Sequence, residues 1–167
     1  GEVESLKGLV DEFSEFARMP APRAVPTDIH ALLTDVIALY RGITDVGIVS
    51  KFGDEMPLVS VDGEKMRRVV INLIDNAIEA MERRGHIDIE THYVPAENLA
   101  RIVVADTGPG IPAADREKLF LPYYSTKQRG SGLGLAIVRR IVAEHGGSID
   151  VVDNTPRGTR FVIELPC

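Results

Sequence analysis

The chain has 167 residues, of which 44% are hydrophobic and 26% are charged, and its formal net charge is -6 at pH 7. These values are typical of one ordinary globular domain, and an acidic chain without a basic run is a poor candidate for non-specific binding to nucleic acid or to an anionic membrane. The single cysteine, Cys167, excludes a disulfide within the chain and indicates a reducing compartment.

The first 26 residues differ in pattern from the rest. Apolar residues recur every three or four positions over residues 2–18, which predicts a helix that is either packed on the domain or one half of a helical hairpin or dimer stalk. The sequence MPAPRAVP follows at 19–26, and its three prolines predict a linker. Because the chain begins with glycine rather than methionine, we expect it to be a piece of a longer protein.

The remaining residues predict helices and strands in the order helix, strands, helix, strand pair, helix, strand pair. The predicted helices lie at about 27–41, 63–84, 113–120 and from the glycines near 132 to 145, and the predicted strands at 46–52, 58–61, 86–94, 100–106, 148–154 and 158–166. Asp62 can cap the long helix and Gly85 can end it. Because most strands are linked as hairpins, we expect an α+β, two-layer sandwich with helices on one face of a mixed, mostly antiparallel sheet.

The helix predicted at 63–84 carries polar residues within an aliphatic stretch. At about 100° per residue, Asn72, Asn76 and Glu79 fall in one narrow arc, and Asp75 lies beside Glu79. Such an arc is usually a solvent-facing surface. Amide and carboxylate oxygens also suit Mg²⁺, which shares the phosphates of a substrate. The helix alone leaves both interpretations open.

Three further segments each allow a structural and a functional interpretation. DTGPGI, at 106–111, is either a tight turn or a place where a ligand approaches the backbone and donates to the aspartate. GSGLGLAIV, at 130–138, is either a loop before a core helix or an anion site at a helix N-terminus. KLFLPYYSTKQRG, at 118–130, is either a surface loop anchored by aromatic residues or a lid whose cations reach phosphates.

The order of these motifs resembles the ATP-binding domain of sensor histidine kinases. This group belongs to the GHKL superfamily, with gyrase-type ATPases, a heat-shock chaperone and mismatch-repair proteins. The shared motifs are N-x-x-x-N, D-T-G-x-G, F-x-P-[FY]-x-[ST]-T-K, G-x-G-L-G-L and G-T-x-F, within about residues 58–165. The short lid and the FARMPAP linker are similar to the nitrogen-regulation branch. The resemblance implies a Bergerat-type catalytic domain at 27–167, preceded at 1–26 by the end of a dimerisation-hairpin helix and its linker.

The resemblance also implies roles for individual residues at an ATP site. Asp106 would accept a hydrogen bond from the adenine amino group, and Thr159 would support the adenine pocket. Gly108 and Gly110 would let the base and sugar lie against the backbone. The lid and the glycine-led helix would surround the phosphates. The nucleotide-binding residues expected there are Tyr124, with Tyr123 as the alternative aromatic residue, Lys127, Gly130, Gly132, Leu133 and Gly134.

Asparagines would face the metal and the transferred group. By the same resemblance, Asn76 would hold Mg²⁺, assisted by Asn72 one turn earlier. Gyrase-like and chaperone-like relatives carry a glutamate at the place of Asn72 to activate water, and an amide cannot act as a general base. We therefore expect slow hydrolysis and transfer of the γ-phosphoryl group to a histidine, with Asn72 and Lys127 as the catalytic residues. Glu79, almost two turns from Asn72, is not expected to replace that base.

No histidine in the chain lies in the acceptor pattern H-[DE]-[LIV]-x-x-P-L. We expect structural or surface roles for His30, His86, His92 and His145, and an acceptor on a hairpin outside the chain. The resemblance implies ATP, that hairpin and a response regulator receiver domain as partners, with no nucleic acid. It also implies a homodimeric full protein, a monomeric or weakly dimeric fragment, and a cytoplasmic location below a membrane anchor. The alternatives are a non-catalytic ATP-sensing scaffold and a GHKL ATPase.

Overall fold

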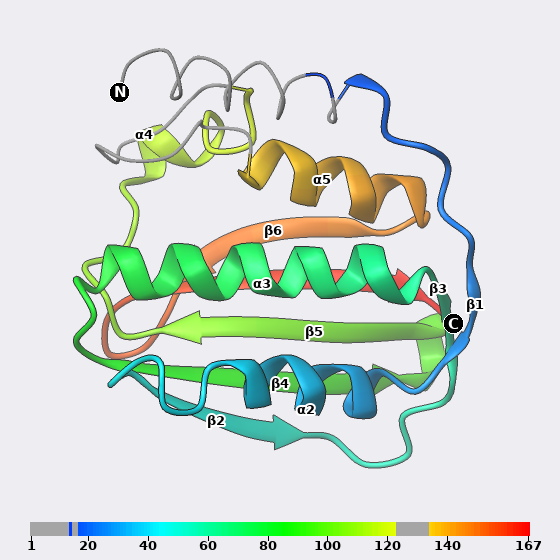
Figure 1. Cartoon of the computed structure of the whole chain (residues 1–167), viewed down its shortest axis with the longest axis horizontal. Helices are drawn as coiled ribbons and strands as arrows, with labels where there is room; N and C mark the ends of the chain where they lie inside the picture. The colour runs from blue at the N-terminus through cyan, green and yellow to red at the C-terminus, as the bar shows by residue number, and fades with distance from the viewer. Residues whose placement is uncertain (1–13, 15–16, 123–133) are drawn as a thin grey trace.

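The computed structural model describes residue 14 and residues 17–122 and 134–167. Most of the helix predicted at 2–18 lies outside these residues. A five-stranded sheet forms one layer of the fold, in the order β2-β4-β5-β7-β6 (Figure 1). Its strands are β2 (Gly47–Phe52), β4 (His86–Val94), β5 (Leu99–Asp106), β6 (Ser148–Asp153) and β7 (Thr159–Pro166). The β2–β4 pair is parallel and the other three pairs are antiparallel, which confirms the predicted mixed, mostly antiparallel sheet.

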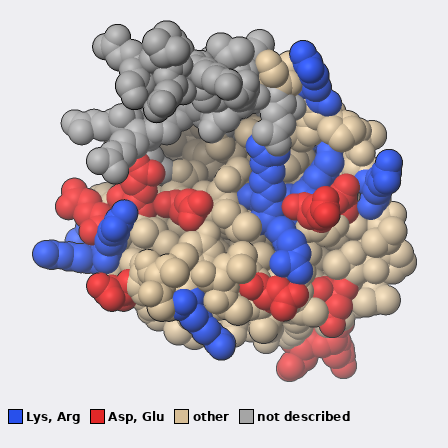
Figure 2. Space-filling view, viewed as in Figure 1, with Lys and Arg blue, Asp and Glu red and all other residues tan. Residues whose placement is uncertain are grey.

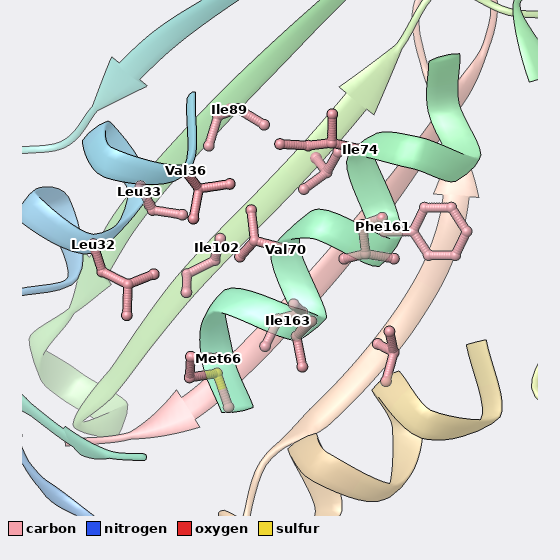
Figure 3. Close-up of a cluster of buried hydrophobic side chains, with 14 of the residues drawn as sticks. Leu32, Leu33, Val36, Met66, Val70, Ile74, Ile89, Ile102, Phe161 and Ile163 are labelled. Atoms are coloured by element: carbon pink, nitrogen blue, oxygen red, sulfur yellow. The ribbon is translucent and has the colours of Figure 1, made fainter. Parts of the chain in front are cut away.

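Three helices cover one face of this sheet (Figure 1). They are α2 (Ile29–Leu39), α3 (Gly63–Ala80) and α5 (Gly134–Glu144). The short helices α4 (Ala113–Arg116) and η1 (Pro95–Glu97) lie in connections. Side chains of the two layers meet in a single core, where Val70 and Ile74 of α3 lie over Ile102 of β5 (Figure 3). The alternation of buried and exposed positions along β4 and β7 directs the apolar residues toward the helices, as a half-buried strand requires. The predicted α+β two-layer class is confirmed.

The opposite face of the sheet is charged. Glu90 of β4 forms a two-pronged ion pair with Arg160 of β7, and Arg101 of β5 pairs with Glu164 of β7 at 2.8 Å. On the helix-covered face, basic and acidic side chains lie mixed over the same surface (Figure 2). Within the described residues, no helix is both long enough and apolar enough to cross a bilayer.

The residues of the predicted linker contact the domain. Val25–Thr27 form strand β1, which pairs antiparallel with β3 (Val59–Val61) as a separate two-stranded sheet. The strands at 47–52 and 59–61, which the sequence places on either side of a turn, therefore take different partners. A residue that precedes proline favours the extended conformation, so Pro26 is compatible with a short edge strand.

The long helix ends earlier than predicted. It stops at Ala80 rather than near residue 84, because Glu82 and Arg83 adopt left-handed conformations with φ of 53° and 65°. Met81 is only 6% exposed, and its sulfur lies where the chain turns past Gly85. Gly85 has φ of +139°, and a Cβ atom on it would lie 2.7 Å from this sulfur, so any other residue there would be strained. The helix predicted at 113–120 is likewise shorter and covers only Ala113–Arg116.

Asp62 joins the linker to helix α3. Its Oδ1 accepts from the backbone N–H of Lys65 and caps α3, while its Oδ2 accepts from the backbone N–H of Arg23 at 2.9 Å. Its own N–H donates to Nε2 of His145, which follows α5. The bond from Arg23 is the main cause that holds the pKa of the Asp62 carboxyl below its ordinary value.

We expect Asp62→Ala to lower the free energy of unfolding by about 1–2 kcal/mol at neutral pH, because it removes a helix cap and the linker contact together. Since the folded-state pKa is lowered, this stabilisation is present above the ordinary carboxyl pKa and is lost as pH falls through the folded value. Urea unfolding at neutral and acid pH measures both effects. The matched control is Asp28→Ala, which removes only the α2 cap. Equal losses in the two variants would contradict a joint role for Asp62.

Candidate functional site

Helix α3 presents its two asparagines beside the start of α5. The Nδ2 group of Asn72 donates to the carbonyl oxygen of Gly134 at 3.4 Å, and both Asn72 and Asn76 are half-buried. Asp75, in contrast, accepts a 2.8 Å hydrogen bond from the hydroxyl of Tyr40, so it belongs to the α2 side of the helix. The predicted polar arc is therefore divided: Asn72 contacts α5, Asn76 follows it one turn later on the same side of α3, and Asp75 lies toward Tyr40.

Asp106 ends the central strand β5 and is only 4% exposed. Its Oδ1 accepts from the backbone N–H of Gly108 at 2.9 Å and from that of Thr159 at 3.1 Å. Among the described residues no group donates to Oδ2, and no fully buried side-chain oxygen lacks a partner, so Oδ2 reaches accessible space. Burial raises the pKa of this carboxyl, and the two N–H donors only partly offset it. The side chain thus offers one fixed and one open oxygen.

The glycines after Asp106 suit the close packing and the backbone conformation of this loop. A Cβ atom at Gly108 would lie 3.1 Å from both Asp106 Oδ1 and Met81 Cγ, where the loop meets the end of α3. Gly110 has φ of +82°, a conformation that other residues rarely adopt. The sequence interpretation explained these glycines by the approach of a ligand. The structure supplies a second reason, because the loop folds tightly around its own carboxylate.

The segment expected to form a lid is anchored at its beginning. Leu119 is 8% exposed, and the ring of Phe120 packs edge-on against Phe161 with 6.4 Å between centroids. The guanidinium group of Arg139, on α5, lies 5.9 Å from the centre of the Phe120 ring. These contacts attach the segment to α5 and β7, both of which border the site. The predicted site residues that lie outside the described residues are Tyr124, Lys127, Gly130, Gly132 and Leu133.

The donor set at this site suits Mg²⁺ shared with a phosphate ligand. Among the described residues, no group of three or more His, Cys, Asp or Glu side chains is placed to hold a metal ion. Amide oxygens are hard ligands, and Mg²⁺ is commonly bound through one or two protein oxygens together with phosphates and water. Asn72 points its nitrogen at Gly134, and no donor in the described part of the chain reaches its Oδ1. The asparagines therefore fit such an ion only if a ligand completes its coordination.

The four histidines have local partners. His30 bonds to Thr91 at 2.8 Å and stacks on Phe52, and His145 uses both ring nitrogens, toward Asp62 N–H and the carbonyl of Ile141. His86 pairs with Asp88, and His92 with Glu90, on the open face of the sheet. These contacts agree with the structural roles expected from the sequence.

A helix-covered mixed sheet, an Asp-Thr-Gly loop at the end of its central strand and a glycine-led helix beside two asparagines together define a GHKL-type nucleotide-binding domain. Residues 61–167 match the family described as histidine kinase-, DNA gyrase B- and HSP90-like ATPase. The chain belongs to this family, and the curated relatives that it matches include sensor histidine kinases.

The sensory histidine kinase/phosphatase NtrB of Rhodobacter capsulatus is 33% identical over 99% of this chain and 50% of its own length. The nitrogen regulation protein NtrY of Azorhizobium caulinodans is 36% identical over 98% of this chain and 22% of its own length. The chain thus spans half or less of the length of these relatives.

Solved structures show the same fold. Full-length ShkA in complex with AMPPNP superposes with a TM-score of 0.86 at 30% identity, over 97% of this chain and 36% of that one. Histidine kinase ThkA in complex with the response regulator protein TrrA superposes with a TM-score of 0.82 at 30% identity, over 99% and 48%. The sequence-based assignment to the sensor histidine kinases of the GHKL superfamily is confirmed.

One part of the site was missed from the sequence. The loop between β6 and β7 contacts the Asp106 loop through Asn154 and Arg157. The G-T-x-F motif marks the end of this loop at Gly158. The two contacting side chains lie in no motif, and about 50 residues separate them from Asp106, so no local pattern could have identified them.

Proposed function

We propose that the chain binds Mg-ATP and donates its γ-phosphoryl group to a histidine on a dimerisation hairpin outside this chain, for relay to a response regulator receiver domain. The observation that carries this proposal is that the two carboxylate oxygens of Asp106 differ. Backbone N–H groups bond to Oδ1, and Oδ2 is open to a ligand donor. The complex of the relative ShkA with AMPPNP supports the binding of ATP, and the complex of ThkA with a response regulator protein supports the relay.

Asp106 would recognise the base. Its open Oδ2 would accept a hydrogen bond from the adenine amino group, because Oδ1 is already engaged. Gly108 and Gly110 would leave room for the base and sugar beside the backbone, and Thr159, 4% exposed at the start of β7, would support the pocket.

The phosphates would lie between α3, α5 and the lid. Asn76, assisted by Asn72, would hold Mg²⁺, which when bound offsets the negative charge of the triphosphate. Lys127 would bring a lid cation to the γ-phosphate. The remaining contacts proposed for the nucleotide are those of Tyr124, Gly130, Gly132, Leu133 and Gly134.

The amide of Asn72 favours transfer over hydrolysis. An amide cannot remove a proton from water, so it cannot serve as the general base that a carboxylate provides in hydrolytic relatives. Glu79, on the same helix, is exposed and lies almost two turns from Asn72. The γ-phosphoryl group would therefore remain on ATP until the hairpin histidine attacks it. Catalysis would consist of positioning the reactants and stabilising the charge of the transferred group.

The chain would be one part of a longer kinase. We propose that residues 1–26 end a dimerisation-hairpin helix and link it to the catalytic domain at 27–167. The whole protein would be a homodimer in the cytoplasm, near a membrane anchor, and this piece a monomer or weak dimer. The similarity to NtrB and NtrY supports the nitrogen-regulation branch.

Labelling in trans tests the proposal. The chain is mixed with γ-labelled ATP and with the full-length protein carrying Asp106→Asn, which keeps the hairpin but lacks a working nucleotide site. We expect acid-labile phosphohistidine on the full-length partner and little free phosphate. Binding of ATP without labelling would favour a sensing scaffold. Rapid release of phosphate without labelling would favour an ATPase.

A further inference from the structure

The loop between β6 and β7 holds the backbone of the Asp106 loop. The Nδ2 group of Asn154 donates to the backbone carbonyl of Asp106 at 2.7 Å. The backbone N–H of Asn154 donates to the carbonyl of Gly158 at 3.0 Å, so the position of Asn154 is itself fixed by its loop. The side chain is half-buried. A short bond of this kind restricts rotation of the peptide that follows the carboxylate-bearing residue.

Arginines hold two other carbonyls of the same loop. Nε of Arg157 donates to the carbonyl of Gly108 at 2.9 Å, and Nε of Arg116 donates to the carbonyl of Ile111 at 3.2 Å. Arg116 also pairs with the carboxylate of Asp153, at the end of β6. Three carbonyls between positions 106 and 111 thus receive a side-chain donor, and these bonds restrict a loop that contains two glycines and a proline.

Gly158 allows the two loops to approach this closely. Its φ is +112°, and a Cβ atom on it would lie 1.9 Å from the carbonyl oxygen of Asp106. The next residue, Thr159, donates its backbone N–H to Asp106 Oδ1 at 3.1 Å. The β6–β7 loop and the start of β7 therefore fix Asp106 at two points, its backbone carbonyl and its Oδ1, and so determine the direction of Oδ2.

We propose that Asn154 and Arg157 are positioning residues that direct Asp106 Oδ2 and thereby set the selectivity of the site for a purine with an amino group at C6, as in adenine, over one with a carbonyl oxygen there, as in guanine. This inference rests on the proposed function. Neither side chain needs to touch the nucleotide. Their effect is carried by the orientation of the peptide that follows Asp106, which Asn154 holds, and of the peptide that follows Gly108, which Arg157 holds.

The selectivity follows from the chemistry of the two purines. At the equivalent ring position adenine carries an amino group, which donates, and guanine carries a carbonyl oxygen, which accepts. An ionised carboxylate oxygen is an acceptor only, so a fixed Oδ2 bonds to the first base and repels the second. Discrimination of this kind requires a site whose polar groups cannot turn away. Once Asp106 can rotate, it should bind adenine less well and reject guanine less strongly.

Nucleotide titrations of the 167-residue chain test the inference. For Asn154→Ala and Arg157→Met we expect ADP affinity to fall by about three- to tenfold, the range for one lost hydrogen bond. GDP affinity should fall less or rise, so the ratio of ADP to GDP affinity should narrow. Arg157→Gln keeps an N–H donor near the Gly108 carbonyl and should recover part of the ratio.

Arg101→Met is the matched control. It removes an arginine bonded to Glu164 on the open face of the same sheet, and it should leave the ratio unchanged. Asn154 is half-buried, so its variant could fail to fold. Arg157 is exposed, and its substitution by itself tests the positioning role. Equal losses for ADP and GDP, or an unchanged ADP affinity, would overturn the positioning role.

Two outcomes separate this inference from the proposed function. If Asp106→Asn abolishes the preference for ADP while the Asn154 and Arg157 variants keep it, the nucleotide site stands and the positioning role is wrong. If the unchanged chain has no preference for ADP over GDP, both proposals are overturned.

Discussion

Asp106→Asn is expected to weaken ADP binding by about 10- to 100-fold, the range for loss of a hydrogen bond to a charged group. The amide would keep its oxygen toward the N–H groups of Gly108 and Thr159, because they can only donate. Its nitrogen would then occupy the open position and meet the adenine amino group donor to donor. Calorimetric titration measures the loss, and unchanged affinity would remove Asp106 from the base site.

The same substitution should not destabilise the unliganded protein. Burial raises the folded-state pKa of the Asp106 carboxyl. A raised pKa means that stability is greatest below the unfolded value of 3.8 and is lost as pH rises through the folded value. An ionised carboxylate in this buried position carries a charge-desolvation penalty that the neutral amide of an asparagine lacks. We therefore expect Asp106→Asn to melt at or above the temperature of the unchanged chain at neutral pH, with the difference shrinking in acid.

Asp88→Asn provides a matched control, because its expected effect on stability at neutral pH is opposite to that of Asp106→Asn. Burial acts to raise the pKa of the Asp88 carboxyl, but hydrogen bonds from Lys51 and His86 hold it below its ordinary value. This substitution should lower stability at neutral pH and leave nucleotide affinity unchanged, because Asp88 lies on the open face of the sheet. A fall in affinity with Asp88→Asn would show that the titration reports general stability rather than the site.

Asn76→Ala is expected to abolish the dependence of nucleotide affinity on Mg²⁺. The unchanged chain should bind ATP more tightly with Mg²⁺ than with a chelator present, and in the variant these two affinities should become nearly equal. Transfer to the hairpin histidine should fall on the order of 100-fold, because a misplaced triphosphate loses the geometry of in-line attack. Paired titrations with and without Mg²⁺ measure the first effect, and phosphohistidine formation measures the second.

Glu79→Ala, on the same helix, is the control for this experiment. Glu79 is exposed and is not expected to hold the metal, so its variant should keep the full Mg²⁺ dependence. If Asn76→Ala weakens binding equally with and without Mg²⁺, Asn76 contacts the nucleotide directly rather than through a metal. If Glu79→Ala abolishes the Mg²⁺ dependence instead, Glu79 rather than Asn76 is the residue that holds Mg²⁺.

The sequence by itself determined most elements and the family. Apolar periodicity located α2, β4 and β5 closely, and Asp62 caps α3 where side-chain chemistry predicts. The sequence also predicted Asn72, Asp106 and Thr159 as site residues, because each stands in a short motif of fixed spacing. Local patterns report such features well, since helix caps, alternation and glycine turns depend on neighbouring residues.

Only the tertiary structure decided how distant segments meet. Strand β2 pairs parallel with β4 and not with β3, and β1 arises from proline-rich residues because β3 offers it an edge. Likewise, the role we propose for Asn154 depends on its hydrogen bond to the carbonyl of Asp106, 48 positions away in the sequence. A single side chain in a loop carries no periodicity, so its partner depends on which strands lie side by side. The motifs therefore predicted the groups at the candidate site, and the packing of the β6–β7 loop fixed the direction of the oxygen we expect to recognise the base.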